Sequence, residues 1–274
     1  MATESNPRES DSHGLDAGLL ILRGAGLFLL LTYGWEKFWG YAQMAREGGP
    51  WESSGLAPLI RAMGFPAPVL LGIYATLCES VGAFLIACGF LTRPVAVLAA
   101  ISMAGAFYTS LRLQEEPLRA ALYFFIFAAV ALTGPGKFSV DYWLRSKRVK
   151  VNPGGLQSDA GLLALRLGVG TVFVLLSVLR HGEGGTVFIF HPGRAWPLIA
   201  LGAGAALVTL GFQTRVVSTC IALAWAWALG TGLYLGQTFY LFPVRAVLFV
   251  IVFAALAFTG AGRFSVDHVF DSRR

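Results

Sequence analysis

The sequence predicts an all-α integral membrane protein with eight transmembrane helices, arranged as two four-helix bundles. Three observations predict this fold. Hydrophobic residues make up 56% and charged residues only 13% of the 274 residues, and the mean hydropathy is +0.66, which leaves too little polar surface for a water-soluble globule. Apolar segments of about 18 to 25 residues recur along the chain. Finally, one nine-residue motif occurs twice.

The repeated motif divides the chain into two halves. It occupies residues 133–141 and, 126 residues later, residues 259–267, and seven of its nine positions are identical. Each copy directly follows a long apolar run, so the chain is expected to contain two copies of one structural unit. We therefore expect an N-terminal tail at 1–14, a first four-helix repeat at 15–144, a basic linker at 145–157 and a second repeat at 158–274.

Each half offers four apolar segments that can cross about 30 Å of hydrocarbon as a helix. They cover residues 15–39, 68–91, 94–111 and 118–133 in the first half, and 159–179, 195–212, 216–235 and 240–259 in the second. The first segment lacks a basic leader region and a nearby cleavage site, so it is expected to remain as a helix. Arg23 and Arg166, about one turn into the first segment of each half, are expected to reach the lipid headgroups by snorkelling.

Basic residues indicate how the chain is oriented. The sequence pI is about 9.5, but the basic residues do not form an amphipathic face with interleaved aromatics, so no nucleic-acid partner is expected. They gather in the linker, at Arg145, Lys147, Arg148 and Lys150. The positive-inside rule then places the linker and both termini in the cytoplasm. Both halves enter the lipid bilayer from the same side, as a parallel repeat.

The two halves differ in the charges that they keep on their outer side. When the halves are aligned, Tyr33, Glu79 and Glu115 of the first half fall opposite leucines of the second. An apolar residue removes the cost of burying a charge and also any proton or anion chemistry. The residues that the second half does not keep, together with the neighbouring cation, form the candidate functional set: Glu79, Lys37, Tyr33, Glu36, Arg112 and Glu115.

Glu79 is the strongest candidate in this set. It lies about 16 Å of helix rise from Pro68, near the bilayer centre, where an ionisable group costs on the order of several kcal/mol unless it is paired, wetted or protonated. The alternative is that Glu79 is a protonated carboxyl, hydrogen-bonded inside the bundle. By position alone, Glu36, Arg112 and Glu115 are also typical interfacial charges, and Tyr33 is typical of a membrane anchor.

Charges that both halves keep are expected to belong to the scaffold. Arg93 and Asp141 are predicted to form an ion pair at the cytoplasmic face, which would hold the segment after the last helix against the hairpin. Arg215 and Asp267 are predicted to form the equivalent pair in the second half.

The sequence carries no signal for a resident redox cofactor. The four histidines (His13, His181, His191 and His268) lie in tails or loops, so no pair is placed to clamp a haem. There is no cysteine set for an iron–sulfur cluster and no glycine-rich fingerprint for a flavin, and no metal site is expected. If the protein takes part in electron transfer, a quinone or a partner protein must carry the electrons.

Together, these residues resemble the DoxX family of bacterial and archaeal four-helix membrane proteins. The resemblance covers nearly all of the first half and, more weakly, the second, so the chain is similar to a tandem DoxX fusion. One position departs from the family pattern, because many members have His where this chain has Tyr33. The order and spacing of these residues carry the resemblance: Arg23, Gly34, Lys37, Glu79, Gly82, Gly89, Thr92, Arg93, Pro94 and 134–141.

The resemblance implies a protein of the bacterial inner membrane and the first two of three candidate functions, and the buried Glu79 adds the third. The first is an accessory or quinone-facing subunit of a larger membrane redox complex, with other subunits as partners and no redox cofactor of its own. The second is the membrane subunit of a thiosulfate:quinone oxidoreductase, with the outer charges binding an anion above a quinone near Glu79. The third is a small-solute or proton transporter with Glu79 in its path.

Overall fold

The computed structural model describes residues 7–53, 55–113, 115, 117–145, 156–179, 196–234 and 242–271. Every regular element in these ranges is a helix. Part of the predicted N-terminal tail and most of the predicted basic linker lie outside the described residues.

Two long helical rods open the first half, and each contains a π-helical turn. The first rod is α1 (Pro7–Leu29), the π turn η1 (Leu30–Gly34) and α2 (Trp35–Glu47). The second rod is α4 (Pro68–Leu77), the π turn η2 (Cys78–Gly82) and α5 (Ala83–Cys88). The rods are joined by an outer loop that contains the short helix α3 (Ala57–Ala62).

The remaining elements are uninterrupted helices. In the first half they are α6 (Thr92–Arg112), α7 (Leu118–Thr133) and the short α8 (Val140–Arg145). In the second half they are α9 (Leu156–Leu179), α10 (Trp196–Leu210), α11 (Thr214–Tyr234), α12 (Phe242–Thr259) and the short α13 (Val266–Asp271).

Three helices in the described part of the chain are long and apolar enough to cross a membrane: His13–Glu47, Pro68–Cys88 and Thr92–Arg112. Leu118–Thr133 and Ala246–Thr259 are shorter apolar helices. The helix His13–Glu47 has 35 residues, which is about 50 Å of helix. This length exceeds about 30 Å of hydrocarbon, so the helix must tilt or project beyond the bilayer. The total of eight spans remains a prediction.

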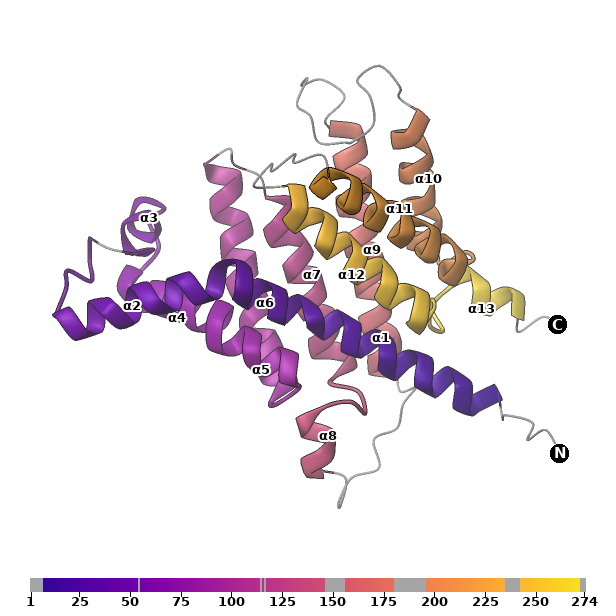
Figure 1. Ribbon diagram of the computed structural model, residues 1–274, viewed down its shortest axis with the longest axis horizontal. Coiled ribbons are helices and arrows are strands. Elements are labelled where there is room, and N and C mark those ends of the chain that lie inside the picture. Colours follow the sequence, from indigo (N-terminus) through magenta and orange to yellow (C-terminus); the bar gives the residue numbers. More distant parts are fainter. Residues whose placement is uncertain are drawn as a thin grey trace.

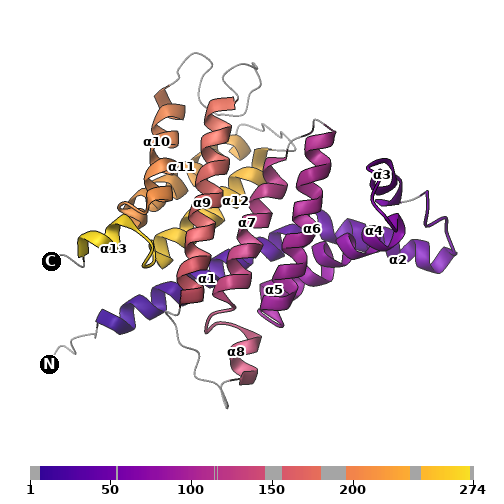
Figure 2. The same ribbon diagram turned by 180° about the vertical axis from the view of Figure 1, so that it is seen from behind.

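The long helices lie in two layers that cross each other (Figure 1). One layer contains α5, α1, α12 and α11, each packed on the next, and the other contains α6, α7, α9 and α10 in the same manner. Figure 2, drawn from behind, shows α6, α7 and α9 in front of α1. Each half of the chain therefore supplies two helices to each layer.

The prediction of two four-helix bundles stays unconfirmed, because the helices of the two halves also pack on each other. Helix α1 packs on α12, and α7 packs on α9, far more extensively than α1 packs on α7. Glycines permit both contacts, because a Cβ on Gly18 would lie 2.8 Å from the carbonyl oxygen of Ala255, and one on Gly161 would lie 3.0 Å from that of Ala129. In lipid, helices associate through such close backbone approach rather than through a hydrophobic driving force.

Candidate functional site

The repeated nine-residue motif, which closes each half and is called the closing motif below, ends in its first copy on Asp141, whose carboxylate caps the N-terminus of α6. It accepts hydrogen bonds from the backbone N–H of Leu91 and from the N–H and hydroxyl of Thr92, each at 2.9 Å. The predicted Arg93–Asp141 ion pair is wrong, because within the described residues the carboxylate is directed to these groups and Arg93 forms no ion pair. The first N–H groups of a helix lack partners, and Asp is among the residues that satisfy them best.

Asp267 makes the equivalent cap on α11 in the second half. Its carboxylate accepts from the N–H groups of Gln213 at 2.7 Å and Thr214 at 3.1 Å. Its own N–H donates to the carbonyl of Gly211 at 3.0 Å. Asp267 is therefore a helix cap rather than the predicted ion-pair partner of Arg215.

The arginines in the first span of each half are buried rather than directed to the headgroups. Arg23 is 1% exposed and Arg166 is 0% exposed, so the snorkelling prediction is wrong. Each donates a hydrogen bond to a backbone carbonyl of the closing motif, Arg23 to Phe138 and Arg166 to Phe264. The arginines thus tie the segment that follows the last helix of each half to the first helix of that half.

Each copy of the closing motif also forms an ion pair with the first helix of its half, and these two pairs were not predicted from the sequence. Asp16 lies 3.2 Å from the Nζ of Lys137 and accepts from its backbone N–H at 2.9 Å. Asp159 lies 3.6 Å from the Nε of Arg263 and accepts from its backbone N–H at 3.1 Å. A signal was present, because Asp16 and Asp159 align with each other when Arg23 is aligned with Arg166.

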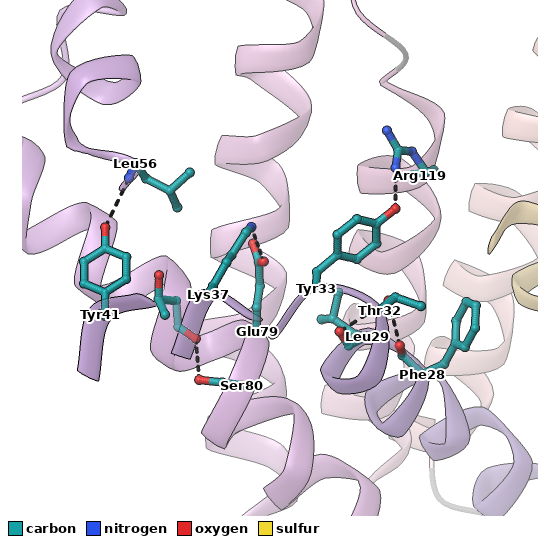
Figure 3. A network of polar contacts seen from close by, with 11 residues as sticks. Phe28, Leu29, Thr32, Tyr33, Lys37, Tyr41, Leu56, Glu79, Ser80 and Arg119 are labelled. Carbon is teal, nitrogen blue, oxygen red and sulfur yellow. Dashed lines mark hydrogen bonds and ion pairs between the residues drawn. The ribbon is translucent and has the colours of Figure 1, made fainter. Parts of the chain in front are cut away.

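Glu79 and Lys37 form an ion pair inside the first half, with the Lys37 Nζ 2.5 Å from the Glu79 Oε2 (Figure 3). The Glu79 side chain is 9% exposed and that of Lys37 is 32% exposed. The pair is therefore open to the surroundings only on the lysine side. Both residues belong to the predicted set, but the sequence did not predict that they meet.

The two π turns bring this pair together. Glu79 lies in η2, and η1 ends at Gly34, one turn before Lys37. Near the turns, the hydroxyls of Thr32 and Ser80 donate to carbonyls of their own helix, Thr32 to Phe28 at 2.7 Å and Ser80 to Thr76 at 2.6 Å. Single π turns inside α-helices are often found at functional sites, and here two of them pack against each other.

Tyr33 points to the other side of η1 and contacts Arg119 of α7 (Figure 3). The guanidinium donates a hydrogen bond to the Tyr33 hydroxyl and lies 5.7 Å from the centre of its ring. Arg119 has a counterpart in the second half, Arg245, so the expectation that charges kept by both halves are structural would place it in the scaffold. The structure places it beside a residue of the candidate set.

The other three candidates lie outside this contact network. Glu36, Arg112 and Glu115 are exposed, and in the described part of the chain none of them forms an ion pair with Lys37 or Glu79. Their positions agree with the alternative interpretation, in which they are interfacial charges.

The second half has no equivalent of the π turns within its described residues. Leu176 and Leu201, which align with Tyr33 and Glu79, lie in α9 and α10, and both helices are α-helical throughout. In the same described ranges, no group of three or more His, Cys, Asp or Glu residues is placed to hold a metal ion. The candidate site is therefore the Lys37–Glu79 pair with Tyr33 and Arg119 beside it, all in the first half.

The region that contains this site can be compared with known proteins. Residues 18–111 match the DoxX family. This DoxX-like region includes Arg23, Tyr33, Lys37 and Glu79, but neither Arg119 nor the closing motifs. The chain also resembles the inner membrane protein YphA of Escherichia coli (strain K12), with 34% identity over 80 residues, which is 29% of this chain. It spans about half of that relative, 49% of its length. No solved structure matches the chain.

Proposed function

We propose that the protein is a DoxX-like integral membrane subunit of a quinone-linked redox complex in the bacterial inner membrane. In this proposal the chain has eight spans in two tandem DoxX-like repeats, with both termini in the cytoplasm. The first repeat carries the functional site and the second is its packing partner. The observation that carries the proposal is the ion pair of Lys37 with the buried Glu79, formed where two π turns pack against each other.

A buried ion pair is a poor means of stabilising this fold. Removing two charges from water costs several kcal/mol per ion in real proteins, roughly as much as their attraction returns, and an apolar replacement is often as stable. The second half has Leu201 in place of Glu79, so the architecture does not require an acid at this position. An ionisable residue within a membrane span is by default a functional one, and we assign Glu79 that role.

The pair can bind a ligand. Lys37 is the more exposed partner, so a ligand can reach the pair from the lysine side. A bound quinone would supply the redox chemistry, which takes up protons on reduction, and the electrons would come from a partner subunit. The polar groups fit such a ligand, because the Nε of Arg119 is buried and has no acceptor in the described structure, and a carbonyl oxygen would satisfy it.

The same arginine favours a second candidate function, the membrane subunit of a thiosulfate:quinone oxidoreductase. No acid pairs with Arg119 in the described residues, so an anion could balance its charge. A transporter is less well supported, because transporter sites pair interrupted helices from both repeats, and here the described interruptions lie in the first half.

Gentle purification from membranes tests these functions. Co-eluting redox subunits and an extractable quinone would support the first function, and thiosulfate-dependent quinone reduction would support the second. A protein that purifies alone and moves solute or protons in liposomes would support transport instead.

Two variants connect the function to the site. Glu79→Leu, which introduces the residue of the second half, should assemble but retain much less quinone than wild type. Glu36→Leu, which removes an exposed acid of the same region, is the matched control and should retain quinone normally. If Glu79→Leu retains as much quinone as the control, Glu79 is a tolerated core acid and the site assignment fails.

A further inference from the structure

The hydroxyl of Tyr123, on α7, is buried and has no hydrogen-bond acceptor among the residues that the structure describes. Tyr123 is 2% exposed, and its hydroxyl oxygen is unpartnered in the described structure. The Thr32 hydroxyl lies beside it but already donates to the carbonyl of Phe28 at 2.7 Å, so it has no hydrogen left to donate to the Tyr123 oxygen. A buried hydroxyl without a partner loses its water and gains nothing in return.

The second half shows that packing does not require this hydroxyl. Phe249 occupies the aligned position on α12 and is 1% exposed. Tyr123 stacks on Phe127 with ring centres 5.8 Å apart, and Phe249 stacks on Phe253 with ring centres 6.2 Å apart. A phenyl ring therefore fills the same place in the fold, and only the first half carries the hydroxyl.

The hydroxyl lies at the candidate site. It interacts electrostatically with Tyr33, Glu79 and Arg119. Arg119 lies one helical turn before Tyr123 on the same face of α7, and its Nε is the second buried donor in this region without an acceptor. Two buried donors without acceptors, one of them on a cation, thus lie one helical turn apart on the same face of α7.

We infer that the Tyr123 hydroxyl and the Arg119 Nε form a donor pair for an acceptor oxygen of a bound ligand. The shared chemistry is an oxygen that carries negative or partial negative charge, which is either a ring carbonyl of a quinone or an oxygen of a small oxyanion. Only the choice of a quinone as the ligand rests on the proposed function. The donor pair itself follows from the structure of the first half. Tyr123 is then a ligand-binding residue that neither the sequence comparison nor the conserved charges indicated.

Binding to the full-length protein in nanodiscs tests this assignment, with isothermal titration of decylubiquinone and, separately, of sodium sulfate. Whichever probe wild type binds, Tyr123→Phe should bind it about tenfold more weakly than wild type does, as expected for one lost hydrogen bond to a ligand. Its unfolding temperature should not fall, because Phe249 shows that the ring alone packs well.

The reciprocal variant is the control. Phe249→Tyr should lower the unfolding temperature, because it buries a hydroxyl in a half that has no such site, and should leave binding unchanged. If wild type binds sulfate but no quinone and Tyr123→Phe weakens this binding, the donor pair is supported and the quinone-linked function is overturned. Equal binding by wild type and Tyr123→Phe, or binding of neither probe by wild type, overturns the donor pair.

Discussion

Gly34 packs directly on the backbone of Glu79. A Cβ at Gly34 would lie 2.0 Å from the Glu79 carbonyl oxygen and 3.0 Å from the Cα of Ser80. No side chain fits between the two rods here, so the π turns meet backbone to backbone. Lys37 lies one turn beyond this contact, and the close approach lets its ammonium reach the Glu79 carboxylate at 2.5 Å.

Gly34→Ala should separate the two rods and destabilise the protein by about 1–3 kcal/mol, as expected for overpacking against a backbone that cannot move aside. Thermal unfolding in detergent measures the effect. Gly24→Ala is the control on the same rod, because a Cβ there would meet nothing within 4 Å, and Ala favours a helix over Gly by about 1 kcal/mol. Equal stability of the two variants would show that the contact is not tight.

Lys37→Met should destabilise the protein by about 3–5 kcal/mol, because it leaves the buried Glu79 without its cation. The double variant Lys37→Met with Glu79→Leu should recover most of this loss, since an apolar pair of similar volume replaces the ions. Chemical unfolding of wild type, the two single variants and the double variant gives the coupling free energy between Lys37 and Glu79. Additive losses in the double variant would contradict the ion pair as the link between the rods.

Asp141→Ala should cost about 1–2 kcal/mol, the usual effect of losing a helix cap. Arg93→Met should change stability by less than about 0.5 kcal/mol, because Arg93 is exposed and makes no ion pair in the described structure. Melting temperatures of the two variants distinguish a cap from an ion pair. Similar losses in both would restore the Arg93–Asp141 pair that the sequence suggested.

Gly89→Ala should destabilise the protein more than Gly64→Ala. Both glycines have a left-handed backbone, with φ of 74° and 77°, so each alanine should cost about 1–2 kcal/mol in backbone strain. Only Gly89 lies against buried side chains, because its Cβ would be 1.8 Å from the Nη1 of Arg23 and 2.6 Å from the Cβ of Ser139, whereas a Cβ on Gly64 would meet nothing within 4 Å. The difference in unfolding free energy measures these two contacts, and a difference near zero would show that both side chains can move away.

Residues 1–150 and 151–274, expressed as separate chains in one cell, should co-purify as a complex. Each half expressed alone should aggregate or be degraded, because α1 would lack α12 and α7 would lack α9. Size-exclusion chromatography in detergent reports the result. A first half that purifies alone as a stable monomer would show that the contacts of α1 with α12 and of α7 with α9 are dispensable.

The sequence predicted the features that depend on local pattern. Long apolar runs predicted the helical membrane class, the repeated closing motif predicted Asp141 and Asp267 as structural residues of each half, and the loss of acids from the second half pointed to Glu79. The helical membrane class and the structural role of the two aspartates were confirmed, because hydrophobic length and residue type are properties of the chain itself, and the functional role of Glu79 stays a prediction. Partner choice was different, since Asp141 could face either a side-chain cation or the free N–H groups of a helix end.

Only the tertiary structure decided which groups meet. The apolar faces of equivalent helices are chemically alike, so no pattern reveals that α1 packs on α12 and α7 on α9. The π turns depend on how two rods fit together at Gly34, and they shift the register by which Lys37 reaches Glu79. The unpartnered hydroxyl of Tyr123 has no counterpart in any pattern, because the sequence shows a tyrosine and only packing shows that its hydroxyl is buried without an acceptor.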